Sequence, residues 1–211
     1  MKTNKAFYVA LYGIMLAAIA VAMALDRLFS LGLGISTAAI VLLVMFSFAF
    51  VKNEWLIAFF AGVFFGLSSL VKELIMPGVL GQALLAGAPY LMPVQYMLTR
   101  LPVGIAAFGA YRLLLFLSKN GKMSARSRQI LCISIATFVG LIVNTSLFLG
   151  STILIQKGLG MEFKGFFAII WAVMFTNILP EYLISIIGAP LVVLGVRKGL
   201  HLGIEALPQE E

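Results

Sequence analysis

The sequence is poor in the residues that most enzymes and metal sites use. Its 211 residues include one cysteine, one histidine and only 11% charged residues. A single thiol, Cys132, forms neither an internal disulfide nor a cysteine-based metal cluster. The single imidazole, His201, follows the last long apolar run, and no glycine-rich loop of the phosphate-binding type precedes a helix. We therefore expect no enzymatic activity and no bound cofactor or metal.

Long apolar runs occupy almost the whole chain instead. Hydrophobic residues make up 62% of the sequence and the mean hydropathy is +1.09, outside the range of ordinary soluble domains. A helix needs about 20 residues to cross the hydrocarbon core of a bilayer. The sequence therefore predicts an all-α polytopic membrane protein with one membrane domain and six transmembrane helices. We expect these helices at about 7–25, 31–51, 55–74, 96–117, 130–155 and 165–196.

The segment 75–95 interrupts this pattern. Its prolines and glycines stand among apolar residues, so it is too broken for a regular spanning helix and too apolar for a free linker. We predict a structured outer loop or short helix packed over one mouth of the bundle. Two further prolines, Pro180 and Pro190, predict kinks or breaks in the last helix.

The basic residues predict the orientation. Six spans place both termini on one side of the membrane, together with the turns at 52–54 and 118–129. That side carries ten of the 15 lysines and arginines, and such an excess marks the cytoplasmic side. The net charge of +7 is attributed to this asymmetry rather than to nucleic-acid binding, because no basic stripe with interleaved aromatics is present. The first apolar run is long enough to span, which favours a retained helix over a cleaved signal peptide.

Few polar residues interrupt the predicted helices, and each is a candidate for function because a polar group inside a membrane is costly. Asn144 and Thr145 lie near the middle of the fifth predicted helix, and Asn177 and Glu181 share one face of the sixth. Amides and a carboxylate at similar depth suit a hydroxylated, polar small molecule. The alternative is hydrogen bonding between helices that only holds the bundle together.

A second group of candidates lies at the outer end. Arg100 either extends to the membrane interface or pairs with a carboxylate ligand that enters from outside. Tyr90 and Tyr96 flank the start of the same helix and are candidates to close over a ligand. We expect Lys72-Glu73 to form a solvated rim, with a gate contact as the alternative, and Asp26-Arg27 to be loop charges.

The first predicted helix carries pairs of small residues at a spacing of four. Ala18 and Ala22 form one pair, and Ala20 and Ala24 form a second. Small residues at this spacing allow another helix to approach closely. The partner is either a separate protein or a neighbouring helix of the same bundle.

Together, these features resemble the substrate-binding S-components of energy-coupling factor (ECF) vitamin transporters. The resemblance covers most of the chain, including the six-helix core and the long outer segment between the third and fourth helices. Its motifs are Ala18-x-x-x-Ala22, Thr99-Arg100-Leu101-Pro102-Val103-Gly104, Val143-Asn144-Thr145 and Asn177-Ile178-Leu179-Pro180-Glu181. The Asn-Thr pair with Leu147-Phe148-Leu149-Gly150 is most similar to the branch that contains pantothenate-specific members.

The resemblance implies a function in a prokaryotic plasma membrane. An S-component binds a water-soluble vitamin, here pantothenate as the best candidate, near the outer face. It then docks onto a transmembrane coupling subunit that carries two cytoplasmic ATPase subunits, and it topples in the membrane lipid to release the vitamin inside. By this resemblance Ala18 and Ala22 would contact the coupling subunit, and Arg100, Asn144, Asn177 and Glu181 would contact the ligand.

Two other functions remain open from the residues alone. One is a stand-alone secondary transporter that uses Glu181 as its proton carrier. The other is an intramembrane enzyme or an assembly factor, which the missing nucleophile–base pair disfavours.

Overall fold

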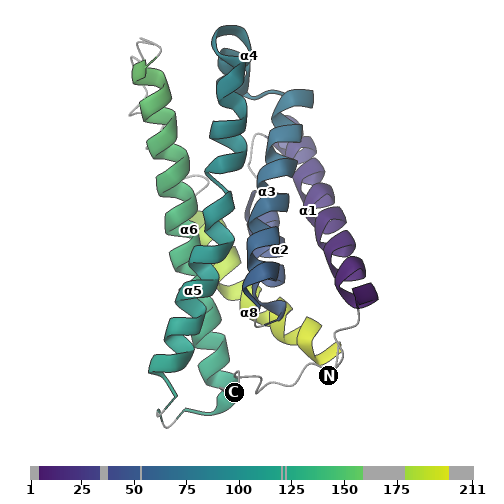
Figure 1. Cartoon of the computed structure of the whole chain (residues 1–211), viewed down its shortest axis with the longest axis vertical. Helices are drawn as coiled ribbons and strands as arrows, with labels where there is room; N and C mark the ends of the chain where they lie inside the picture. The colour runs from purple at the N-terminus through teal and green to yellow at the C-terminus, as the bar shows by residue number, and fades with distance from the viewer. Residues whose placement is uncertain are drawn as a thin grey trace.

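The computed structural model describes residues 5–33, 38–52, 54–119, 121, 123–158 and 179–199. All the regular structure in these ranges is helical, and the long helices run side by side as a bundle (Figure 1). The elements in chain order are α1 (Lys5–Leu33), α2 (Ala38–Val51), α3 (Trp55–Ile75), α4 (Val79–Gly87), η1 (Pro89–Leu91), η2 (Val94–Leu98), α5 (Leu101–Leu117), α6 (Ala125–Gly158) and α8 (Leu179–Gly199).

Five helical segments of the described chain are long and apolar enough to cross a membrane. They lie in α1, α3, the stretch from η1 to α5, α6 and α8, and α2 is a shorter apolar helix. The described part of the chain is therefore an all-α protein of the multi-pass membrane type. The sixth span and the side on which the termini lie stay predictions.

Several helix boundaries differ from those expected. The first helix continues to Leu33 instead of ending near residue 25, and the second begins at Ala38 instead of 31. Asp26 does not end α1, because its side chain is only 5% exposed and its carboxylate is 3.4 Å from the Lys72 ammonium of α3. The interpretation of Asp26-Arg27 as loop charges is thus wrong. The predicted outer loop at 75–95 contains α4, η1 and the start of η2, as the short-helix alternative anticipated.

The hydrophobic core is built around α2, a helix that is apolar on all sides. This helix packs against α1, α3, α5 and α8, and a helix with such surroundings has no face left for water. Met45, Phe46, Ala49 and Phe50 are all completely buried. Its uniform sequence is therefore explained by its central place in the bundle.

Glycines bring α3 unusually close to the chain that precedes and begins α5. A Cβ atom on Gly62 would lie 2.6 Å from the Leu101 carbonyl oxygen, and one on Gly66 would lie 2.9 Å from that of Met97. Only glycine permits this approach, and Gly62 and Gly66 have the spacing typical of close helix pairs in membranes. The backbone between η2 and α5 is therefore held tightly against α3.

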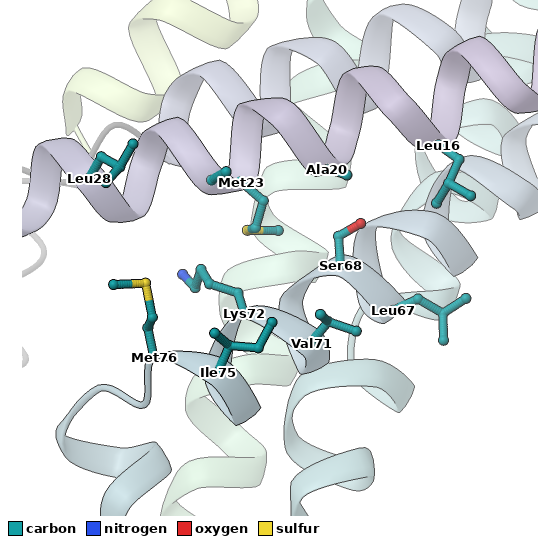
Figure 2. A pocket seen from close by; sticks show the side chains of 11 residues that line it. Leu16, Ala20, Met23, Leu28, Leu67, Ser68, Val71, Lys72, Ile75 and Met76 are labelled. Atoms are coloured by element: carbon teal, nitrogen blue, oxygen red, sulfur yellow. The ribbon is translucent and has the colours of Figure 1, made fainter.

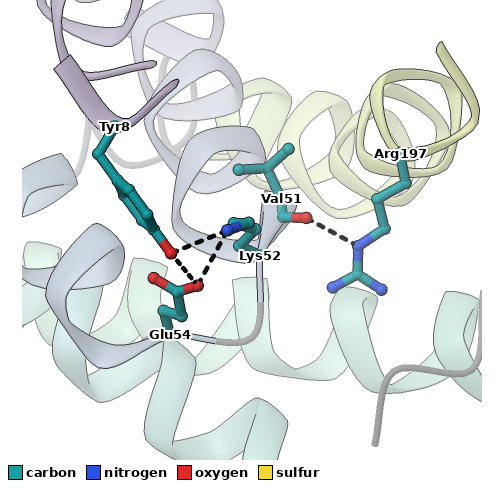
Figure 3. Close-up of polar contacts among 5 residues, drawn as sticks. All are labelled: Tyr8, Val51, Lys52, Glu54 and Arg197. Carbon is teal, nitrogen blue, oxygen red and sulfur yellow. Dashed lines mark hydrogen bonds and ion pairs between the residues drawn. The ribbon is translucent and has the colours of Figure 1, made fainter. Parts of the chain in front are cut away.

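The bundle has two distinct ends. The start of α1 and the end of α8 lie together at the bottom of Figure 1, and α4 lies at the top. We name them the Lys5 end and the α4 end. At the Lys5 end, Arg197 of α8 donates from Nε to the Val51 carbonyl at 3.1 Å (Figure 3). It also donates from Nη2 to the Phe50 carbonyl (2.6 Å) and contacts the Tyr111 hydroxyl at 3.4 Å. This arginine therefore satisfies carbonyls that the last turn of α2 leaves without helical partners.

Candidate functional site

The candidate site begins with a break in the helix that carries Arg100. The turn Val94–Leu98 is a π-helix, and α5 begins only at Leu101. Pro102 has no backbone N–H, so the Leu98 carbonyl lacks the donor that a continuous α-helix would supply. Arg100 is consequently the N-cap residue of α5, and its side chain leaves the chain at a junction between two helices.

Aromatic rings surround the guanidinium of Arg100. Its central carbon lies 4.8 Å from the ring centre of Phe148 on α6, 5.0 Å from that of Phe65 on α3 and 6.0 Å from that of Tyr96 on η2. Among the described residues, its Nε and Nη1 atoms are enclosed and have no hydrogen-bond partner. Unpaired buried donors on a cation are costly, and the rings offset only part of that cost.

Two carboxylates act on this cation from different helices. The charges of Glu73 on α3 and Glu181 on α8 both interact electrostatically with Arg100. Glu73 also interacts with the hydroxyl of Tyr96. Of the residues that the sequence analysis proposed as ligand contacts, Tyr96 therefore lies against Arg100, and Glu181 lies within electrostatic reach of it. The structure adds Glu73 to this group.

Glu73 connects this group to α4. It is 7% exposed, and its Oε2 accepts a hydrogen bond of 2.8 Å from the backbone N–H of Gly78, the N-cap residue of α4. A Cβ on Gly81 would lie 2.5 Å from the same oxygen, so a larger residue there would displace the carboxylate. Its other oxygen lies 3.7 Å from the Lys72 ammonium. The expectation of a solvated rim is wrong for Glu73, because the carboxylate is buried and holds the covering helix.

A hydroxyl pair lies beside Glu181. Thr145 on α6 and Tyr182 on α8 have their side-chain oxygens 3.0 Å apart, a contact that joins these two helices. The preceding residue, Asn144, has an enclosed side-chain oxygen with no hydrogen-bond partner in the described part of the chain. Thr145 thus takes part in helix–helix contact, as the structural alternative anticipated, whereas the acceptor on Asn144 is unused.

Among the described ligand-contact candidates, Tyr90 does not lie with this group. Tyr90 lies in η1 with 72% of its surface exposed, whereas Tyr96 is buried at 4%. Asn177 lies outside the described residues. Of the two tyrosines, only Tyr96 therefore lies against Arg100.

Gln95 was not anticipated by the sequence analysis. Its side chain is fully buried between η2 and α6, where Nε2 donates to Thr152 Oγ1 (2.7 Å) and to the Phe148 carbonyl (3.2 Å). Its Oε1 accepts from Ser151 Oγ at 2.7 Å. A glutamine just before the predicted helix gives little signal in one sequence, because only the tertiary structure shows that α6 supplies partners.

On α1, the structure separates the two pairs of alanines. Ala22 is 4% exposed and belongs to the core, and Ala18 is partly buried. The small residues that face outward along α1 form a stripe: Ala10, Gly13, Ala17, Ala20 and Ala24. A partner helix that approached α1 in this conformation would meet that stripe first.

An apolar groove of about 550 Å³ lies between α1 and α3 (Figure 2). Ala20 and Ala24 of the stripe line one wall, and Val71 and Ile75 line the other. Lys72 is the one charged residue among the lining residues, and Asp26 and Glu73 both pair with it. The groove offers few hydrogen-bonding groups and therefore suits an apolar neighbour better than a polar vitamin.

The Arg100 group, in contrast, contains a cation with hydrogen-bond donors that lack partners among the described residues. A guanidinium presents parallel N–H donors that match the two oxygens of a carboxylate. Comparison of the chain with known protein families, with curated proteins and with solved structures finds no match. The function must therefore be argued from these residues.

Proposed function

We propose that the protein is the substrate-binding membrane subunit of an ECF-type vitamin transporter, with a carboxylate-bearing vitamin as its ligand and pantothenate as the best candidate. The observation that carries this proposal is the Arg100 guanidinium, whose Nε and Nη1 donors are enclosed without partners among the described residues. A ligand carboxylate would supply those partners and replace Glu73 or Glu181 as the counter-charge. Asn144 would accept a hydrogen bond from a ligand hydroxyl or amide.

The proposal places the α4 end outside the cell and the Lys5 end in the cytoplasm. The described residues near the Lys5 end include Lys5, Lys52, Arg126, Arg197 and Lys198, and a basic excess favours the cytoplasmic side. A vitamin would then approach from the side covered by α4. Because Glu73 holds the start of α4 and also acts on Arg100, ligand entry requires a rearrangement of this contact.

The first test is ligand binding by the purified protein. Mass spectrometry of molecules that co-purify in detergent should detect pantothenate, and calorimetric titration should show tighter binding of pantothenate than of panthenol, its alcohol analogue. The neutral analogue keeps every group except the carboxylate, so the difference reports the contact with Arg100. Equal affinity for the two compounds would contradict the assignment of Arg100.

The second test is assembly. We propose that the exposed stripe on α1 contacts a coupling subunit that carries two ATPase subunits. Ala20→Trp should prevent assembly with these subunits and leave ligand affinity unchanged, because Ala20 is exposed on α1 and is not among the residues around Arg100. Leu113→Trp, at a 58% exposed position of α5, is the matched control for a bulky residue on the membrane-facing surface. Normal assembly of the Ala20→Trp variant would remove α1 from the proposed interface.

A stand-alone transporter driven by a proton gradient is the alternative that the same experiments distinguish. Proteoliposomes that contain only this protein should accumulate no pantothenate when a proton gradient is imposed. Accumulation that disappears in Glu181→Gln would favour the alternative. Uptake that requires ATP and the further subunits would exclude it.

A further inference from the structure

Gln95 of η2 forms hydrogen bonds to Phe148, Ser151 and Thr152 of α6, and we call these four residues the Gln95 clamp. The clamp makes none of the proposed ligand contacts, but it is next to the residues that do. Gln95 is fully buried in the π-helix η2, five positions before Arg100 and next to Tyr96. A π-turn is a costly interruption of a helix and is frequent at functional sites. Such a turn needs contacts from outside the helix to hold it.

Every polar atom of the Gln95 side chain is used in those contacts. The two Nε2 hydrogens have two acceptors on α6, and Oε1 has a donor there. Its own backbone carbonyl accepts from Thr99 Oγ1 at 2.6 Å, which compensates for the disturbed helical hydrogen bonding. The residue therefore fastens η2 to α6 and is completely satisfied.

The clamp shares Phe148 with the candidate site. The carbonyl of Phe148 accepts from Gln95, and its ring lies 4.8 Å from the Arg100 guanidinium. On the other side, a Cβ on Gly62 would lie 3.1 Å from the Arg100 carbonyl, so α3 leaves this backbone no room to shift. The backbone at Arg100 is thus packed closely against α3, and the preceding turn is fastened to α6 by the hydrogen bonds of Gln95.

We propose that Gln95 is a positioning residue, whose side-chain amide fastens η2 to α6 and fixes the Arg100 guanidinium for carboxylate binding. This inference rests on the proposed function. Gln95 touches no ligand in it and acts only through the position of Arg100 and Phe148. Loss of the amide should therefore reduce the preference for a carboxylate, while contacts to the rest of the ligand are kept.

The test uses the full-length protein in detergent, with a matched control. Gln95→Leu removes the three hydrogen bonds at similar side-chain volume, and Gln82→Leu makes the same change at an exposed position of α4. In Gln95→Leu, the affinity for pantothenate should fall about tenfold. The affinity for panthenol should fall less than about twofold, because a displaced guanidinium loses only its contact with the carboxylate. Gln82→Leu should bind both compounds as the unmodified protein does.

A ligand-independent measurement keeps the two proposals separable. The Nε–H resonance of Arg100, observed with ¹⁵N-arginine and assigned by its absence in Arg100→Lys, should be displaced by the neighbouring rings. Gln95→Leu should move it, and Gln82→Leu should not. If Gln95→Leu does not fold, Thr152→Val removes the nearest acceptor of the clamp and should produce the same shift with a smaller loss of affinity.

An unmoved resonance would overturn the inference, and so would a moved resonance with undiminished affinity for pantothenate. If the resonance moves but the unmodified protein binds no pantothenate, the ligand proposed for the protein is wrong, while the control of Arg100 by Gln95 stands.

Discussion

Two arginines at opposite parts of the bundle differ in how completely they are paired. Arg197 at the Lys5 end has backbone carbonyls and a tyrosine hydroxyl around its guanidinium. Arg100 has aromatic rings and the charges of two carboxylates, while two of its nitrogen atoms lack hydrogen-bond partners among the described residues. A saturated cation stabilises a fold, whereas an unsaturated one retains the capacity to bind.

The difference also separates the two ends of the bundle. At the Lys5 end, the polar groups of Tyr8, Lys52 and Glu54 pair with one another within 3.1 Å (Figure 3). At the α4 end, the buried carboxylate of Glu73 interacts with the cation Arg100, with Tyr96 and with the start of α4. We expect substitutions at the Lys5 end to change stability and those at the α4 end to change binding.

The largest expected effect is on ligand affinity. Arg100→Met should weaken pantothenate binding by about 3 kcal/mol, more than a hundredfold, because it removes the charged partner of the ligand carboxylate. Two effects on the melting temperature oppose each other, because the substitution removes buried donors without partners and also removes a counter-charge of Glu73 and Glu181. We therefore expect the melting temperature to change less than the affinity does. Titration calorimetry and thermal unfolding in detergent check the two quantities. If Arg100→Met has a lower melting temperature and binds pantothenate normally, Arg100 stabilises the fold and does not bind the ligand.

The matching change at the other end should affect stability alone. Arg197→Met leaves the Phe50 and Val51 carbonyls and the Tyr111 hydroxyl without this donor, at a cost of about 2–3 kcal/mol. Lys198→Met, at the neighbouring exposed position, is the control and should be nearly neutral. Thermal unfolding measures both variants. Unchanged pantothenate affinity is expected, and a large loss would show that the two ends are coupled.

Removal of the carboxylate that holds α4 should have an intermediate effect. Glu73→Gln weakens the hydrogen bond to the Gly78 N–H and should destabilise the protein by about 1 kcal/mol. Because the bond holds one end of α4, hydrogen exchange should accelerate in Val79–Gly87 and not in α2. Exchange followed by mass spectrometry distinguishes these segments. Uniform acceleration would show that Glu73 supports the whole fold rather than α4.

An effect of similar size is expected where α6 and α8 meet. Tyr182→Phe removes one partner of the 3.0 Å contact with Thr145 and should cost about 1 kcal/mol of stability. Thr145→Val should cost a similar amount, and the double variant should cost less than the sum of the two. If the double variant is fully additive, the two hydroxyls do not interact.

The smallest effect is a pH dependence at the Lys5 end. Burial alone would lower the pKa of Lys52, but hydrogen bonds to Tyr8 and Glu54 and the charge of Glu54 outweigh it and raise the pKa above 10.5. The stabilisation from Lys52 is therefore complete below the pKa of the unfolded chain and is lost as the pH rises through the higher folded pKa. For this partly exposed pair it should amount to less than about 1 kcal/mol. Lys52→Met should unfold with less alkaline sensitivity than the parent protein, measured between neutral pH and pH 11.

Much of the fold could be predicted from hydropathy, because a membrane imposes its thickness on helix length. The segments 55–74 and 130–155 fall inside α3 and α6, whose ends differ by few residues. The boundary between the first two helices could not be predicted, because the partner of Asp26 is Lys72 on another helix and that pairing is not visible in the sequence. From the sequence alone, a charged residue such as Asp26 is therefore interpreted as the end of a membrane helix.

The candidate site, too, could be predicted only in part from the sequence. Arg100, Tyr96 and Glu181 were identifiable because polar groups are rare in such a sequence. Glu73 was expected in solvent and Gln95 was not identified, since their partners come from α4 and α6. On α1, spacing alone gave two equivalent pairs of alanines, and only packing showed that Ala22 faces the core while Ala20 and Ala24 face outward.

The sequence by itself determined that this chain forms apolar helices of membrane-spanning length and keeps only a few polar groups among them, because both properties follow from transfer free energies of individual residues. The tertiary structure alone decided which of these polar groups are satisfied, because a hydrogen bond between helices depends on distance and orientation that no local pattern encodes. That distinction separates Arg197, each of whose guanidinium nitrogens has a hydrogen-bond partner, from Arg100, two of whose nitrogens have none among the described residues.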